Sequence, residues 1–262
     1  MEYVHAVILG VVQGIAEFLP ISSSGHLVIA DAVLRELSGS SVPEESATMG
    51  IALHFGTLIS ILVVYRTELM GFLSDRRLVV QIILATIPVG VVGVMFGSWV
   101  EHAFQTPLLA GCGLLVTAVF LLVGHALQRQ DEHVEEISMV TAFVIGLFQA
   151  VAVIPGISRS GSTIAAGMLQ GLTRERAARF SFLIAIPAIG GAAVMQLKKV
   201  LTGEEPFSGD PGAIALGTVI AFVVGVVALR WLLKLVIADR IYVFAIYCVV
   251  IGATTIVWQL CT

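Results

Sequence analysis

Charge is what this sequence lacks most. Only 12% of its 262 residues are Asp, Glu, Lys or Arg, whereas 58% are hydrophobic. A typical soluble domain carries about twice that share of charge. A surface that faces water cannot be covered with so few charges, but a surface that faces lipid tails can. The composition therefore excludes an ordinary soluble protein and predicts an integral membrane protein.

Cysteine is also scarce. Cys112, Cys248 and Cys261 are widely spaced, so they give neither a metal-ligand spacing nor a disulfide framework. The start of the chain lacks a positively charged leader followed by a small-residue cleavage site. We therefore interpret it as part of the mature fold.

Long apolar runs are abundant. A transmembrane helix needs about 20 mainly apolar residues. Six stretches meet this requirement: 47–65, 78–98, 107–127, 179–198, 212–234 and 241–259. We expect an all-α polytopic fold with these six full transmembrane helices in a single membrane domain, 1–262.

Two further apolar segments, 4–34 and 138–172, are interrupted near their middles. Pro20 is followed by serines and a glycine, and Pro155 by Gly156 and another serine-rich stretch. Proline removes a helical hydrogen bond, and irregular backbone at membrane depth survives only inside protein or beside water. Each segment is therefore predicted to be a re-entrant helix hairpin. The alternative is a pair of kinked, tilted spanning helices.

The two interrupted segments resemble each other at a fixed offset of 136 residues. The shared positions pair Ala6, Gly10, Gln13, Ala16, Ile21, Ser22, Ser24, Gly25 and Ala30 with Ala142, Gly146, Gln149, Ala152, Ile157, Ser158, Ser160, Gly161 and Ala166. Each hairpin is followed by three spans, and an odd number of crossings inverts the second copy. The sequence predicts an inverted-topology repeat, with repeat one at about 1–128 and repeat two at about 138–262.

Cationic residues predict the orientation. Of the 14 Lys and Arg, those in loops opposite the N-terminal face are Arg66, Arg76, Arg77, Arg129, Arg174, Arg176, Arg179, Arg230, Lys234 and Arg240. The N-terminal face holds only Arg35, Lys198 and Lys199. The positive-inside rule then places both termini outside. The first hairpin therefore enters from outside and the second from the cytoplasm, so their tips are expected to meet near the middle of the membrane.

The first hairpin carries a set of polar residues. Gln13 and Glu17 share one helix face, and a carboxylate inside a membrane indicates function by default. Ser22, Ser23, Ser24, Gly25 and His26 follow, so a hydroxyl nucleophile, an imidazole and a helix N-terminus lie close to that acid. The bland alternative for Glu17 is a side chain that reaches the membrane surface.

The second tip supplies a cation. Arg159 is the one Lys or Arg outside the loops and helix ends, and it lies among Ser158, Ser160, Gly161 and Thr163. Helix N-termini bind anions, and a guanidinium matches phosphate oxygens. These residues predict a phosphate or diphosphate ligand beside Glu17. The alternative is a purely structural ion pair between Arg159 and Glu17.

These two segments resemble the undecaprenyl-diphosphate phosphatase family, also called bacitracin-resistance proteins. The resemblance is carried by Gln13-Gly14-Ile15-Ala16-Glu17-Phe18-Leu19-Pro20, by Ser22-Ser23-Ser24-Gly25-His26, and by Pro155-Gly156-Ile157-Ser158-Arg159-Ser160-Gly161-Ser162-Thr163. It implies removal of the terminal phosphate from a C55 isoprenoid diphosphate at the outer face of the plasma membrane. It also implies that the essential acid, serine, histidine and arginine are Glu17, Ser23, His26 and Arg159. Gln13 stands where some members have Glu, which weakens any mechanism that needs two carboxylates.

Two mechanisms stay open. Ser23 could attack to form a phospho-enzyme, or Glu17 could activate water while His26 protonates the leaving group. The resemblance implies a divalent cation, Mg²⁺ or Ca²⁺, for which Glu17 and Gln13 are the candidate ligands. The expected partners are the isoprenoid diphosphate and membrane lipids, without nucleic acid, and with a homodimer as an option. The rival function is a lipid-phosphate flippase or secondary transporter.

Overall fold

Every regular element in the described part of the computed structural model is helical. The structure describes residues 2–38, 47–97, 99, 103, 106–128, 136–204 and 206–261, so Arg129 of the orientation argument lies outside it. The helices are α1 (Glu2–Ala16), α2 (Ser23–Ser38), α3 (Ala47–Val64), α4 (Arg66–Ser74), α5 (Arg76–Met95), α7 (Pro107–Ala126), α8 (Met139–Val151), α9 (Arg159–Leu169), α10 (Arg174–Thr202), α11 (Pro211–Ile237) and α12 (Tyr242–Cys261).

Within the described residues, five helices are long and apolar enough to cross a membrane: α5, α7, α10, α11 and α12. The shorter apolar helices are α1, α2, α3 and α8. The prediction of an all-α polytopic membrane protein is therefore confirmed. The remaining expected span, 47–65, corresponds to α3, which is 18 residues long and belongs to the shorter apolar helices. The expected number of six full spans is therefore not confirmed.

Helix ends differ from the expected spans because capping, rather than hydropathy, ends a helix. The predicted span 179–198 lies within the longer α10, which begins where Thr173 accepts a hydrogen bond from the Arg176 amide at 3.3 Å. It ends at Gly203 in a left-handed conformation (φ 77°). The short helix α4 was not predicted, since its mixed sequence lacks an apolar run.

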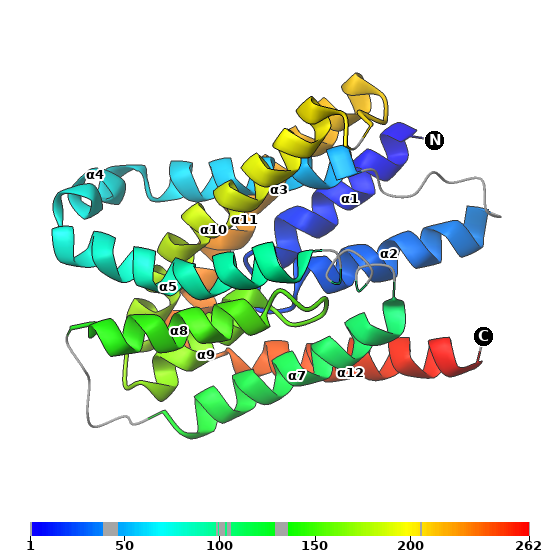
Figure 1. Cartoon of the computed structure of the whole chain (residues 1–262). Helices are drawn as coiled ribbons and strands as arrows, with labels where there is room; N and C mark the ends of the chain where they lie inside the picture. The colour runs from blue at the N-terminus through cyan, green and yellow to red at the C-terminus, as the bar shows by residue number, and fades with distance from the viewer. Residues whose placement is uncertain are drawn as a thin grey trace.

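Several helices from the first half of the chain pack against helices from the second half. In Figure 1, α1 lies along α11 and α8 lies along α5, while α7 packs on α12. Close approach depends on glycine at matching positions. A Cβ at Gly10 would lie 2.8 Å from the carbonyl oxygen of Gly217, and one at Gly146 would lie 2.6 Å from that of Ala85. Small residues let helices in a membrane approach backbone to backbone.

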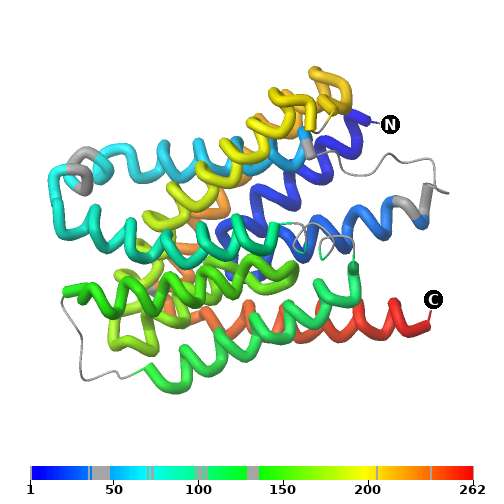
Figure 2. Tube along the Cα trace, viewed as in Figure 1, coloured from blue at the N-terminus to red at the C-terminus, as the bar shows by residue number. Residues whose placement is uncertain are grey.

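Two helix hairpins meet at the centre of the molecule. Figure 2 shows α1 and α2 opening toward the end that holds both termini, and α8 and α9 opening toward the opposite end. The turns between their arms are residues 17–22 and 152–158, both buried over most of their length. The two turns therefore bring the conspicuous polar motifs into the interior.

Candidate active site

The first hairpin turn is held by a single serine. Ser22 has a left-handed backbone (φ 70°), which is uncommon for a residue other than glycine. Its hydroxyl accepts a hydrogen bond from the Gly25 amide at 3.2 Å, and its carbonyl oxygen accepts one from the His26 amide at 3.2 Å. Ser22 thus caps α2, and the chain reverses just after Glu17.

The second hairpin turn repeats this cap. The Ser158 hydroxyl accepts from the Gly161 amide at 3.1 Å, and the Ser158 carbonyl accepts from the Ser162 amide at 2.8 Å. Thr117 of α7 fixes the turn: its hydroxyl donates to the Gly156 carbonyl at 2.8 Å and accepts from the Ser158 amide at 2.8 Å. Arg159 is therefore the first residue of α9, on a rigid support.

The two turns are in direct contact. A Cβ at Gly25 would lie 2.8 Å from the Gly156 Cα, so no larger residue fits there without a shift. The Ser160 hydroxyl donates to the carbonyl oxygen of Leu19 at 3.3 Å, which joins the second tip to the first. These contacts explain how residues 142 positions apart come to share one site.

Glu17 is the centre of the site. Its side chain is 6% exposed, and its two oxygens have different partners. Oε1 accepts from the Arg159 guanidinium at 2.6 Å, and Oε2 accepts from the Ser23 hydroxyl at 2.6 Å. Gln13 adds a bond from its amide nitrogen to Oε2 at 3.1 Å. The structure thus brings together four of the predicted residues, Gln13, Glu17, Ser23 and Arg159.

The ion pair leaves part of the site unsatisfied. Arg159 Nη1 and Gln13 Oε1 are buried and have no hydrogen-bond partner among the residues that the structure describes. Leaving a buried donor or acceptor unpaired costs about 1–3 kcal/mol, so such atoms call for an explanation. A structural ion pair alone does not account for them, whereas an oxygen-rich ligand would accept from Arg159 Nη1.

His26 lies beside this centre but faces another partner. Its Nδ1 donates to the Ser22 carbonyl at 2.8 Å, because that oxygen can only accept. Its Nε2 is then left to accept from the Tyr247 hydroxyl at 2.8 Å, and the two rings stack at 5.5 Å. The imidazole is thus oriented by Ser22 and by Tyr247 of α12, a residue that no sequence pattern singles out.

Several of the hydroxyls predicted to bind substrate make hydrogen bonds within the protein. The Thr163 hydroxyl donates to the Arg159 carbonyl at 2.8 Å and bonds to Ser181 of α10 at 2.6 Å. Ser158 and Ser160 are 1% exposed, and their hydroxyls lie 3.2 Å apart. Ser22 and Ser24 form the matching pair at 3.1 Å. These bonds position Arg159 and Ser23, so the hydroxyls near the tips are not all free for a ligand.

His54 of α3 joins the site. A lone histidine in an apolar span is more often a core residue, yet the Nε2 of His54 lies 3.8 Å from Glu17 Oε2. Its Nδ1 donates to the Gly50 carbonyl at 2.8 Å, so Nε2 is the nitrogen that faces the carboxylate. The signal that could have found it is a lone histidine in a strongly apolar span.

The candidate metal ligands make a small donor set. No group of three or more His, Cys, Asp and Glu side chains is close enough to hold a metal among the residues that the structure describes. Glu17 and the unpartnered Gln13 Oε1 nevertheless offer two oxygens. Mg²⁺ is often held by one carboxylate together with substrate phosphates and water. The residues therefore fit a cation that binds with the substrate rather than before it.

Comparison with known proteins gives a consistent result. The sequence matches the family described as bacitracin resistance protein BacA over residues 6–254. Curated relatives named undecaprenyl-diphosphatase include one from Rhodopirellula baltica, 44% identical over 99% of both chains. Others come from Parabacteroides distasonis, 41% identical over 98% of both chains, and Methanobrevibacter smithii, 38% identical over 96% of both chains. Each of these chains is similar to the present one along nearly its whole length.

Proposed function

The chain belongs to the bacitracin resistance protein BacA family, and we propose that it is an undecaprenyl-diphosphatase of the membrane. It hydrolyses undecaprenyl diphosphate to the monophosphate and inorganic phosphate. The product is the lipid carrier on which cell-envelope glycans are built, so its regeneration supports wall synthesis and bacitracin resistance.

One observation carries this proposal at the level of chemistry. Glu17 uses one carboxylate oxygen for Arg159 and the other for Ser23, and these two residues come from different hairpins. A phosphatase needs a group that takes a proton from the attacking oxygen and a cation for the transferring phosphoryl group. A flippase or secondary transporter would need the anion site but no activated hydroxyl, so the Ser23–Glu17 bond favours catalysis.

The membrane arrangement is an inverted-topology repeat in which both hairpins are re-entrant. Support comes from the central position of both turns in Figure 1 and from the packing of each hairpin on a helix of the other half of the chain, α1 on α11 and α8 on α5. The positive-inside rule places the arginine-bearing helix α4 on the cytoplasmic side and both termini outside. The first hairpin then opens to the outer face of the plasma membrane, from which the diphosphate reaches the site.

In the serine route, the two carboxylate oxygens of Glu17 have different roles, since Oε2 contacts Ser23 and Oε1 contacts Arg159. Glu17 Oε2 takes the hydroxyl proton as Ser23 Oγ attacks the terminal phosphorus. The bond between that phosphorus and the bridging oxygen breaks, and the lipid monophosphate leaves with the proton that Glu17 took from Ser23. Arg159, whose Nη1 lacks a protein partner, stabilises the negative charge on the phosphoryl oxygens. Water then hydrolyses the phosphoserine, with Glu17 as the base, and releases phosphate.

The water route remains the alternative. Here Glu17 activates a water molecule directly, and His26 donates a proton to the leaving lipid phosphate. Because both ring nitrogens of His26 are engaged, by Ser22 and Tyr247, this role requires His26 to exchange Tyr247 for the substrate. The serine route needs no such exchange, since Ser23 is already bonded to its base.

A divalent cation, Mg²⁺ or Ca²⁺, fits beside these residues. Glu17 and Gln13 would hold it, and it would add positive charge against the diphosphate oxygens. The chain's own contribution is to place Glu17 within reach of Ser23 and to keep Arg159 opposite. Chelation is expected to lower phosphate release, and added Mg²⁺ or Ca²⁺ to restore it.

Phosphate release by the purified full chain in detergent tests the function. Farnesyl diphosphate and undecaprenyl diphosphate are the substrates, and Glu17→Ala is the comparison variant. The wild-type chain should release one phosphate per diphosphate. The rate of phosphate release by Glu17→Ala should be lower by about 10³-fold or more. Absence of release by a folded wild-type chain, with and without Mg²⁺, would contradict the proposed function and favour the transporter.

A further inference from the structure

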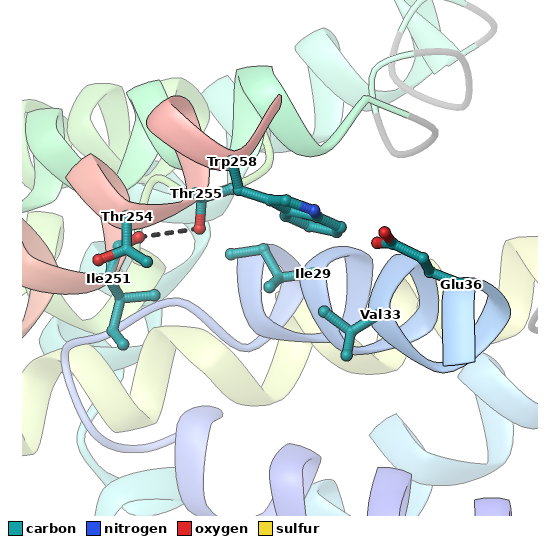
Figure 3. Close-up of a pocket in the computed structure, with 7 residues that line it drawn as sticks. All are labelled: Ile29, Val33, Glu36, Ile251, Thr254, Thr255 and Trp258. Carbon is teal, nitrogen blue, oxygen red and sulfur yellow. Dashed lines mark hydrogen bonds between the residues drawn. The ribbon is translucent and has the colours of Figure 1, made fainter. Parts of the chain in front are cut away.

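An apolar groove runs along the molecule between α2 and α12. Its volume is about 490 Å³, and it is lined by Ile29, Val33, Glu36, Ile251, Thr254, Thr255 and Trp258. Figure 3 shows α2 residues forming one wall and α12 residues the other. Both helices also pack against α7. The groove lies in the half of the molecule that holds both termini (Figure 1).

The inner end of this groove lies next to the His26–Tyr247 pair. His26 of α2 and Tyr247 of α12 join the two walls through their hydrogen bond and stacked rings. Ile29 follows His26 by three residues and Ile251 follows Tyr247 by four, so each lies one helical turn outward on the same face. The groove therefore begins one turn from the residues that flank Ser23.

The lining suits a hydrocarbon and not a charged group. The Thr254 and Thr255 hydroxyls donate to the carbonyls of Val250 and Ile251, both at 2.8 Å, so their polar atoms are already paired with backbone. Among the lining residues that the structure describes, the charged one is Glu36, at the outer end beside Trp258 (Figure 3). A carboxylate repels a diphosphate, so the anionic group belongs at the Arg159 end and an apolar chain in the groove.

On the basis of the proposed phosphatase function, we infer that this groove binds the isoprene units that follow the first one in the substrate tail. The tail of a lipid whose diphosphate lies at the hairpin tips has to leave the polar site through the protein wall. The groove gives it an apolar path from His26 and Tyr247 to the surrounding bilayer. From Ile29 to Glu36 the α2 wall rises about 10 Å, which is long enough to contact several carbons of the tail.

Narrowing the groove tests this inference. Val33→Trp and Thr254→Trp each place a large side chain in it, whereas Val257→Trp is the matched control on α12, at a residue that is 61% exposed and not part of the lining. Both groove variants should raise KM for farnesyl and undecaprenyl diphosphate about tenfold, because contacts of roughly two methylene groups are lost. The KM for isopentenyl diphosphate, whose tail is too short to fill the groove, and kcat for all substrates should stay within twofold of wild type.

A second measurement uses the unaltered chain. A farnesyl diphosphate analogue with a diazirine in its tail should label residues of α2 and α12 that line the groove, and excess undecaprenyl diphosphate should prevent the labelling. Labelling confined to other helices would overturn the inference, as would groove variants with unchanged KM for the long substrates or an equal rise for the C5 substrate. Changes only in oligomer size or co-purifying lipid would show that a second copy or a bilayer lipid occupies the groove, which also overturns it. A wild-type chain that hydrolyses no diphosphate would instead refute the phosphatase function itself.

Discussion

The two hairpin tips share a scaffold and differ in their chemistry. Ser22 and Ser158 cap their helices with the same bond, to the amide three residues later. The residue after each cap differs, since it is Ser23 in one tip and Arg159 in the other. Both of these side chains nevertheless contact Glu17, one on each carboxylate oxygen. Two similarly capped turns therefore place two different donors on one acid.

The acid itself has no counterpart. The position equivalent to Glu17 in the second hairpin is Val153. The backbones differ as well: Ser22 has φ 70°, whereas Ser158 has φ −69°. A left-handed residue other than glycine costs about 1–3 kcal/mol and tends to occur at functional sites. The comparison indicates that the first tip carries the reactive groups and that the second supplies a stiff electrostatic support.

Removing the cation of the second tip should have the largest effect. Arg159→Ala should lower kcat/KM by about 10³-fold, because the charge that stabilises the phosphoryl group is lost. It also leaves the buried Glu17 without its cationic partner, at a cost of about 3–5 kcal/mol in stability. Arg159→Lys keeps the charge without the planar fork, so it should fold and lose about 10²-fold. Steady-state phosphate release and thermal unfolding measure the two effects, and full activity in a folded Arg159→Ala would refute the role.

The hydroxyl at the matching position of the first tip should behave differently. Ser23→Ala should fold with nearly wild-type stability, since it removes one partner of Glu17 and keeps the ion pair. Turnover should fall by about 10³-fold if Ser23 is the nucleophile. Rapid quenching with a substrate labelled in the terminal phosphate should trap label on the wild-type chain and none on Ser23→Ala. Substantial turnover in Ser23→Ala, with no label on either protein, would favour attack by water.

The glycines that follow the two caps should also respond differently. A Cβ at Gly25 would lie 2.8 Å from the Gly156 Cα, whereas the nearest atom to one at Gly161 would be the Ser158 Cβ, at 3.1 Å. Gly25→Ala pushes the tips apart and should cost about 2 kcal/mol, while Gly161→Ala should cost about half as much. Thermal unfolding of the two variants gives this difference. Equal losses would mean that the tips are not in close contact.

The smallest effect is expected at His54, which contacts the acid from outside both tips. His54→Ala should lower kcat about tenfold, because Glu17 loses a neighbour 3.8 Å from Oε2. His54→Gln, which keeps a polar side chain beside Glu17, should recover most of the activity with an unchanged KM. If His54→Ala alters stability but not kcat or its pH profile, His54 is only a packing residue.

Much of the site could be predicted because expensive residues stand out in an apolar chain. Glu17 and Arg159 are costly in a membrane without a partner, and the likeness of the two interrupted segments predicted that their tips would meet. Tyr247 could not be predicted, since an aromatic residue in a span carries no sign of a histidine partner. The hydroxyls of Ser160 and Thr163 carried no sign that they bond to Leu19 and Ser181, because sequence spacing does not reveal contacts across helices.

The fold was predictable to the same degree. Apolar runs located the long helices, but their ends depend on caps such as Thr173, which hydropathy does not register. Helix α4 escaped prediction because it lacks an apolar run.

A double-mutant cycle on Glu17 and Arg159 tests the central claim most directly, namely that the two tips act on one phosphate as a unit. kcat/KM for farnesyl diphosphate is measured for wild type, Glu17→Gln, Arg159→Lys and the double variant, with Val153→Ile as a control that should remain near wild type. Residues that act as a unit are strongly non-additive. If the two tips act as a unit, kcat/KM of the double variant should be no more than about tenfold below that of Glu17→Gln alone. Losses that multiply in full would contradict it, because the two residues would then act independently.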